Sequence, residues 1–294
     1  MKQLLVLSGK GGTGKTTIAN ALIELFQAKR FADCDVDAPN LHLLKEEMEQ
    51  KAKRPFYGLK TAKINLDTCI NCGLCSEHCA FQAISKKEYY TVDPFSCEGC
   101  GLCARICPVQ AIQMIEKQAG VLSLYQEKDQ LFSTATLRMG SGNSGLLVTE
   151  VKKQITDNPH LGMVIIDGAP GIGCPVIASL SGADACLMIA EPTVSGFSDL
   201  KRVIATARSF HPLLFVCINK YDINEQLSED IQTYCLQEGL DFVGRIPFDE
   251  EVINQLKKKK GLLCASWKSK RAVIQIYLKI KARMEEYENK NISG

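Results

Sequence analysis

The sequence lacks any long hydrophobic run. A helix that crosses a membrane needs about 18 or more consecutive apolar residues, and no segment of this 294-residue chain approaches that length. The apolar run near the start, residues 4–7, ends at Ser8, well short of the roughly 7 to 15 apolar residues of a secretory signal. We therefore expect a cytoplasmic protein with no stable membrane insertion.

An excess of charge of one sign is also missing. The chain carries 35 Lys and Arg against 33 Asp and Glu, a formal net charge of +2. Proteins that hold nucleic acid use clustered positive charge to neutralise phosphates. The lysines of the tail, from Ser266 onward, alternate with apolar residues and predict a helix docked on the protein with a solvated basic face. We expect no nucleic-acid partner.

Cysteine, by contrast, is abundant, with 14 residues. Disulfides are rare in a reducing cytoplasm, so metal binding is the better interpretation. Eight of the cysteines form two groups with the spacing Cys-x2-Cys-x2-Cys-x3-Cys, separated by a repeat of 28 residues: Cys69, Cys72, Cys75 and Cys79, then Cys97, Cys100, Cys103 and Cys107. The shared neighbours Cys-Gly-Leu-Cys and Gln-Ala-Ile show that the unit is duplicated.

This spacing resembles that of bacterial ferredoxins, in which three cysteines of one run bind a 4Fe-4S cluster and the fourth binds the other cluster. The resemblance implies one cluster on Cys69, Cys72, Cys75 and Cys107, and a second on Cys97, Cys100, Cys103 and Cys79. Zinc is the alternative, because pairs of Cys-x2-Cys also form tetrahedral sites. Zinc is disfavoured by the exact repeat and by the absence of a histidine partner.

The sequence around the cysteine groups predicts an α/β fold. Residues 4–7, 163–166, 186–190 and 213–218 are short apolar runs, typical of parallel strands buried on both faces. Helical segments at 16–28, 144–156 and 198–209 lie between them. We predict a doubly wound, mostly parallel sheet of the P-loop NTPase type. Residues 1–60 and 119–294 would form this domain, and residues 61–118, the insert, a small α+β bacterial-ferredoxin domain.

A phosphate-binding loop follows the first predicted strand. Residues 9–17, Gly-Lys-Gly-Gly-Thr-Gly-Lys-Thr-Thr, fit G-x-x-x-x-G-K-[ST] between a strand and a helix. The glycines let backbone N–H groups surround an anion, Lys15 neutralises phosphate charge, and the Thr16 hydroxyl can bind Mg²⁺. We expect this loop to bind nucleotide through Gly9, Lys10, Gly11, Gly12, Thr13, Gly14, Lys15, Thr16 and Thr17.

A second lysine, Lys10, makes the resemblance more specific. The loop is similar to the deviant P-loop of MinD, ParA, Mrp and the nitrogenase iron protein, whose signature lysine reaches the nucleotide of a partner subunit. The resemblance implies ATP with Mg²⁺ and a nucleotide-bound homodimer, or a heterodimer with a similar subunit. Lys10 would act like an arginine finger, placing positive charge on the transferring phosphoryl group when two subunits close.

Three acids match the switch segments of that family. Residues 32–40 resemble the first switch, so Asp35 would support Mg²⁺ through water and Asp37 would orient the attacking water. Asp167 ends an apolar strand, where ligands bind in open α/β sheets, and by resemblance is a carboxylate on the Mg²⁺ side. Together with Lys10 and Lys15, Asp37 and Asp167 are the predicted catalytic residues.

The base would be bound by two later segments. Asn219, Pro247 and Asp249 match adenine-contacting positions of the family, and an asparagine amide can pair with a purine edge. Asn219, Lys220 and Asp222 also fit the guanine-reading pattern of GTPases. The residues alone therefore leave ATP and GTP both open.

The other six cysteines are expected to fill the core as small apolar residues. Cys174 stands seven residues after Asp167, where the nitrogenase iron protein supplies a ligand to a cluster shared between subunits. No second cysteine occurs between residues 120 and 150 to complete such a site, so we predict that Cys174 packs in the core.

Nearly the whole chain resembles a MinD-type ATPase with an inserted ferredoxin domain, a group also labelled as cobyrinic acid a,c-diamide synthases. No amidotransferase domain fits in this length with only four histidines. The leading hypothesis is an ATPase that couples dimer closure to electron transfer, with a redox or iron-sulfur acceptor protein as partner. The alternative is an ATP-dependent iron-sulfur scaffold or carrier. A spatial organiser on membrane or DNA is the weakest hypothesis, because it leaves the cysteines unexplained.

Overall fold

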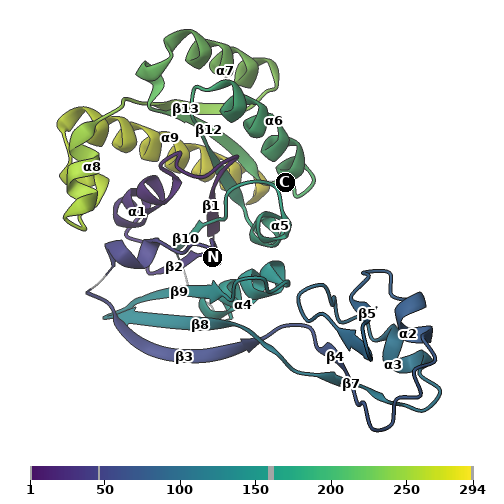
Figure 1. The fold of residues 1–294 in the computed structure, drawn as a ribbon. Coiled ribbons are helices and arrows are strands. Elements are labelled where there is room, and N and C mark those ends of the chain that lie inside the picture. Colours follow the sequence, from purple (N-terminus) through teal and green to yellow (C-terminus); the bar gives the residue numbers. More distant parts are fainter. Residues whose placement is uncertain (1, 46, 158–161, 293–294) are drawn as a thin grey trace.

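The computed structural model describes residues 2–45, 47–157 and 162–292. Within these ranges one sheet of nine strands runs through the molecule in the order β13-β12-β11-β1-β10-β2-β9-β8-β3 (Figure 1). The strands are β1 (Lys2–Ser8), β2 (Arg30–Asp33), β3 (Glu49–Tyr57), β8 (Gln118–Glu127), β9 (Gln130–Leu137), β10 (Met163–Asp167), β11 (Ala185–Ala190), β12 (Leu213–Asn219) and β13 (Asp241–Ile246). All neighbours from β13 to β9 pair in parallel, and β8 and β3 are antiparallel additions at one edge.

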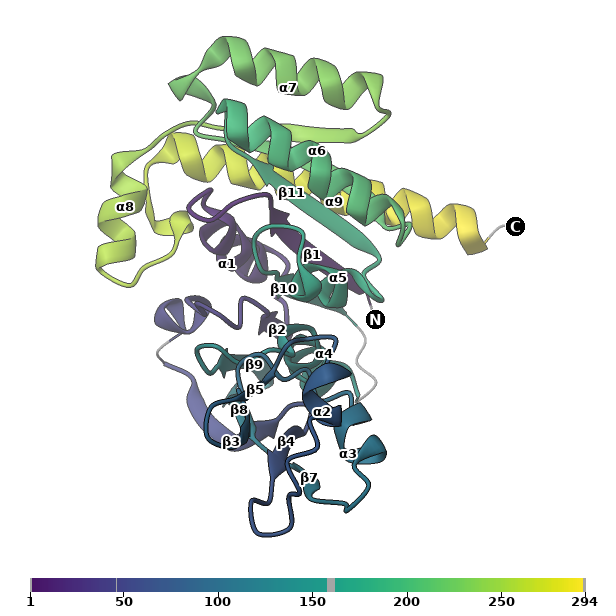
Figure 2. The same ribbon diagram turned by 45° about the vertical axis from the view of Figure 1, so that its right-hand side comes forward.

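Two layers of helices cover the sheet (Figure 2). One face packs against α4 (Ser144–Thr156), α5 (Cys174–Leu180), α6 (Val194–Arg208) and α7 (Glu225–Gln237). The other packs against α1 (Lys15–Leu25), α9 (Trp267–Ile292) and the short turns η1 (Leu41–Leu44) and η3 (Leu262–Cys264). The strand β1 feeds both cores, because Leu5 and Leu7 face one layer and Leu4 and Val6 face the other. This alternation explains why the sequence shows an unbroken apolar run.

The predicted α/β fold is therefore confirmed, with local differences. The helix predicted at 16–28 ends at Leu25, and Gln27 adopts a left-handed conformation with φ of 50° that ends the turn. The helix predicted at 198–209 begins earlier, at Val194, because the Thr193 hydroxyl accepts from the Gly196 N–H and caps it. None of the helices in the described ranges is both long and apolar enough to cross a membrane.

The insert lies beside the main sheet and is joined to it by the β3–β8 pair (Figures 1 and 2). It contains two small antiparallel sheets, β4 (Thr61–Ile64) with β7 (Ile112–Ile115), and β5 (Ile84–Lys86) with β6 (Tyr90–Val92). Two short helices, α2 (Leu74–Glu77) and α3 (Leu102–Ile106), contact each other. Only a few insert residues are buried, among them Ala83, Ile84, Ala111 and Ile112.

Candidate nucleotide cleft and cysteine cavities

The predicted phosphate loop and the predicted switch and base segments meet in one cleft at the carboxyl ends of the parallel strands. Its volume is about 820 Å³, which is large enough for a nucleotide. The cleft is lined by most of the predicted residues: Lys10, Gly11, Gly12, Thr13, Gly14, Lys15, Thr16, Thr17, Asp35, Asp37, Asn219, Pro247 and Asp249. Gly9 is not in that lining and lies against Asp199, where any side chain would collide with it.

Lys15 and Asp167 form a buried ion pair beneath this cleft. The Lys15 ammonium donates to Asp167 Oδ1 at 2.5 Å, and the Asp167 side chain is fully buried. Burial lowers the pKa of Lys15, but the charge and hydrogen bond of Asp167 outweigh it and leave the pKa raised. The other oxygen, Asp167 Oδ2, is buried without a partner. A buried carboxylate oxygen with no donor fits a Mg²⁺ site, because oxygen ligands are those that Mg²⁺ prefers.

A fourth acid, Asp33, was not identified from the sequence. It ends β2 directly beside Asp167, its partner in the parallel register. Its carboxylate accepts from three backbone N–H groups, those of Asp35, Asn40 and Leu41, and so fixes the loop that carries Asp35 and Asp37. Burial and the charge of Asp167 raise the pKa of Asp33 to about 7. The signal in the sequence was its place at a strand end, the position that had identified Asp167.

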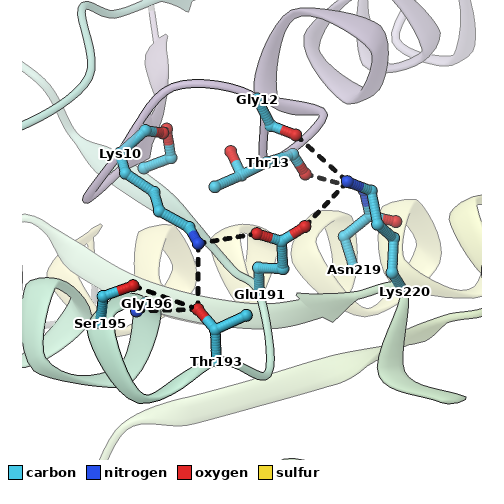
Figure 3. A network of polar contacts seen from close by, with 10 residues as sticks. Lys10, Gly12, Thr13, Glu191, Thr193, Ser195, Gly196, Asn219 and Lys220 are labelled. Carbon is cyan, nitrogen blue, oxygen red and sulfur yellow. Dashed lines mark hydrogen bonds and ion pairs between the residues drawn. The ribbon is translucent and has the colours of Figure 1, made fainter. Parts of the chain in front are cut away.

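Lys10 is held within its own chain. Its ammonium binds Glu191 Oε2 at 2.9 Å and Thr193 Oγ1 at 2.9 Å (Figure 3). The other oxygen of Glu191 binds Lys220 at 2.8 Å, so one carboxylate bridges two lysines. Burial alone would raise the pKa of Glu191, but the bonds from Lys220 and Lys10 leave it lowered. Glu191 and Thr193 follow β11, and no motif had singled them out.

The segment predicted to bind the base contacts the phosphate loop directly. Asn219 donates to the Thr13 carbonyl at 2.8 Å, and Lys220 donates to the Gly12 carbonyl at 3.2 Å (Figure 3). Gly14, with φ of 87°, leaves room for Asn219, because a Cβ there would lie 2.4 Å from the amide nitrogen. Asp222 does not line the nucleotide cleft; it lines a separate cavity, and its Oδ1 accepts from the Phe248 N–H at 2.7 Å.

The eight clustered cysteines line two small cavities in the insert. Each cavity takes three cysteines from one group and the fourth from the other group. One is lined by Cys69, Cys72, Cys75 and Cys107, and the other by Cys79, Cys97, Cys100 and Cys103. These are the two sets named in the sequence analysis.

The 28-residue repeat is also visible in the backbone. Left-handed residues recur at matched positions, as Asn71 and Gly99, Gly73 and Gly101, and Gln82 and Gln110. The fourth cysteine of each run accepts a matched backbone hydrogen bond, from Ala83 to Cys79 Sγ at 3.4 Å and from Ala111 to Cys107 Sγ at 3.3 Å. The two halves thus present their sulfur atoms in the same way.

Within the described ranges, no three His, Cys, Asp or Glu side chains come close enough to bind one metal ion. The two 4Fe-4S clusters therefore stay a prediction from the cysteine spacing.

The prediction that the six scattered cysteines fill the core holds for Cys34, Cys186, Cys217 and Cys235, which are buried. It is wrong for Cys174 and Cys264, which are exposed. Cys174 is the first residue of α5, and it is exposed there while its backbone lies against Gly145 of α4.

Comparison with known proteins agrees with the geometry of the cleft. Residues 4–263 match the model of the CobQ/CobB/MinD/ParA nucleotide binding domain. The uncharacterized protein MJ0578 of Methanocaldococcus jannaschii is 34% identical over 284 residues, covering 95% of this chain and 96% of the relative.

Two solved structures share the fold at low identity. The cell division ATPase MinD of Pyrococcus furiosus has a TM-score of 0.57 at 15% identity, covering 96% of this chain and 98% of its own. MinD of Pyrococcus horikoshii, solved with Mg-ADP, has a TM-score of 0.57 at 14% identity, covering 95% of each chain. The family model spans the phosphate loop and the other segments that line the cleft, and this chain belongs to the CobQ/CobB/MinD/ParA nucleotide-binding family.

Proposed function

We propose that this protein is a Mg²⁺-dependent ATPase that carries two 4Fe-4S clusters in a ferredoxin-like insert at residues 61–118. Nucleotide-driven closure of a homodimer, or of a heterodimer with a similar subunit, would be coupled to electron transfer toward an acceptor protein in the cytoplasm. The observation that carries the proposal is the pair of cavities, each lined by three cysteines of one group and one of the other.

ATP is favoured over GTP by the place of Asp222. In the guanine-reading pattern this acid must face the base, but here it lines another cavity and is occupied by the Phe248 N–H. Asn219 remains at the cleft, where its amide can meet an adenine edge. The MinD structure of Pyrococcus horikoshii, which shares the fold, holds Mg-ADP, and this supports an adenine nucleotide.

The cleft residues have separable tasks in this proposal. Lys15 would bind the phosphates, and Thr16 and Asp167 would hold Mg²⁺, which neutralises phosphate charge when bound. Asp35 lines the cleft and is half-buried, and Asp37 is exposed at its mouth, where it can position water. Lys10 would leave Glu191 and Thr193 when two subunits close, and place its charge on the partner's nucleotide.

The cysteine assignment is tested by iron, sulfide and zinc analysis of protein prepared anaerobically. We expect two clusters of four irons in the wild type. Cys79→Ala should lose the iron of one cluster, whereas Cys264→Ala, an exposed cysteine outside the insert, should keep both. Zinc in place of iron, or unchanged iron in Cys79→Ala, would contradict the assignment. Transfer of a cluster to an apo-acceptor on addition of ATP would replace electron transfer by the scaffold or carrier alternative.

A further inference from the structure

The ion pair of Lys15 and Asp167 occupies groups that a nucleotide and Mg²⁺ would use. In the described structure Lys15 donates to Asp167 Oδ1 at 2.5 Å, and Asp167 Oδ2 has no partner. Phosphates in the loop would compete for Lys15, and Mg²⁺ would bind Asp167 Oδ2, so nucleotide binding would change the partners of both side chains. Asp167 is followed by a short loop, residues 168–173, and then by α5. A change of partner at Asp167 therefore acts first on the start of α5.

Helix α5 is fastened to α4 at both ends. At its start, Cys174 lies against Gly145, where a Cβ would meet the Cys174 carbonyl at 3.2 Å. At its end, the Lys152 ammonium donates to the Ser179 carbonyl at 2.8 Å and to the Ser181 carbonyl. Among helix pairs in the described ranges, α4 and α5 share the most extensive contact. The two helices are therefore packed as one unit.

A buried lysine, Lys152, is an unusual residue to join two helices. It is 8% exposed, and its ammonium bonds to carbonyl oxygens at the carboxyl end of α5. Burial lowers the pKa of Lys152. A buried ammonium costs free energy that a methionine of similar length would not. The negative end of the α5 helix dipole, to which the Lys152 ammonium hydrogen-bonds, offsets this cost of burying the charge.

The start of α4 rests on the insert. The junction loop, residues 138–143, lies between β9 and α4, and a Cβ at Gly140 would fall 2.7 Å from the Phe95 ring. Phe95 belongs to the Cys97 loop, residues 93–99, which carries one cysteine of the second cavity. Lys117 lies 4.6 Å above the Phe95 ring and holds the same loop from the insert side. Phe95, Cys97 and Glu98 share a small pocket with Ser141, Gly142 and Asn143.

We propose that Lys152 is a positioning residue that holds α4 and α5 together as one rigid unit. When the partners of Asp167 change, this unit moves and shifts the Cys97 loop of the insert. The inference rests on the proposed function for its nucleotide and its clusters. It adds the direction of coupling: the second cavity, lined by Cys79, Cys97, Cys100 and Cys103, responds to nucleotide first.

The test is hydrogen exchange of the full, cluster-loaded chain, read at residues 93–107 with and without Mg²⁺ and a non-hydrolysable ATP analogue. We expect the nucleotide to change exchange there by at least about fivefold in the wild type, a typical coupling between linked sites. Lys152→Met should reduce the change to less than about twofold. Lys153→Met, the exposed neighbour on α4, should respond like the wild type.

Phe95→Ala removes the contact between the insert and the junction loop. Because it alters only an exposed side chain, it is the second test variant if Lys152→Met does not fold. Tyr89→Ala, exposed elsewhere on the insert, is its control. A wild type that binds nucleotide without a change at 93–107 would overturn the inference, as would a full response in folded Lys152→Met or in Phe95→Ala. Nucleotide titration and iron content of the same samples report separately on the proposed function.

Discussion

Lys10 and Lys15 belong to one loop but have different partners. Lys15 is buried on Asp167, whereas Lys10 is held at the surface of the cleft by Glu191 and Thr193. We expect Lys10→Ala to bind nucleotide with little change but to lose about 100-fold or more in ATPase rate, since in the proposed mechanism the Lys10 charge would act only in the closed dimer. Steady-state ATPase assays with a nucleotide titration measure both quantities.

The surface variant Lys29→Ala is the matched control for that loss of charge, because Lys29 is half exposed and pairs with Asp129 away from the cleft. An ATPase rate in Lys10→Ala equal to that of Lys29→Ala would remove Lys10 from the catalytic residues.

Asp33 should make the stability of the nucleotide-free protein depend on pH. Its pKa is raised from 3.8 to about 7, so between these values the folded chain binds a proton that the unfolded chain does not. Stability then falls as pH rises through this window and levels off above it. We expect a loss on the order of 2 kcal/mol between about pH 5 and pH 7. Denaturant unfolding at several pH values measures it.

Asp33→Asn cannot release this proton, and its unfolding free energy should vary less across the same pH range. Asp37→Asn changes an exposed acid of the same loop and should keep the wild-type dependence. Equal slopes in the wild type and in Asp33→Asn would show that the buried acid does not titrate in this window.

Asp33 also shows what could not be predicted from the sequence at the scale of single residues. The phosphate loop was predictable because its glycines and lysine follow a fixed spacing. Asp33 was not identified, because its role depends on lying beside Asp167 across the sheet, a contact 134 positions apart in the chain. Glu191 and Thr193 were not identified as site residues for the same reason, since only the fold brings them to Lys10.

Among the elements, α9 shows how well the spacing of apolar residues predicts the buried face of a helix. The spacing of five apolar residues predicted a docked helix: Val273, Tyr277, Ile280, Met284 and Tyr287. Val273, Ile280 and Met284 are buried and Tyr277 is partly buried, but Tyr287 is exposed. We expect Ile280→Ala to lower the free energy of unfolding by about 2–4 kcal/mol, because it leaves a cavity in that core. Leu278→Ala, on the exposed side of the same helix, should cost less than about 0.5 kcal/mol. Comparable losses for both variants in chemical denaturation would contradict the packing of α9.

Period and length predicted four central strands, at 4–7, 163–166, 186–190 and 213–218, and three helices, at 16–28, 144–156 and 198–209, but not where each element ends. The early start of α6 depends on the Thr193 cap, and the end of α1 depends on the left-handed Gln27. The antiparallel pair β3 and β8 was not predicted at all. The described residues of β3 are almost wholly exposed, so the strand carries no buried apolar run that could have revealed it.

At the scale of the whole molecule, the insert and the nucleotide cleft are connected through the junction loop and the pair of α4 and α5. In the proposed coupling, this connection would let a small domain with few buried residues respond to nucleotide at the phosphate loop. It also gives the insert a fixed neighbour, because Phe95 packs on Gly140 and the Cys97 loop shares a pocket with the start of α4.

The central claim is that one chain joins a nucleotide switch to two iron-sulfur clusters. The most direct measurement is an EPR-monitored redox titration of the anaerobic, reduced protein, with and without Mg²⁺ and a non-hydrolysable ATP analogue. The account predicts two cluster signals and a nucleotide-dependent change in the potential or line shape of at least one of them. Two loaded clusters whose signals and potentials are the same with nucleotide bound would contradict it.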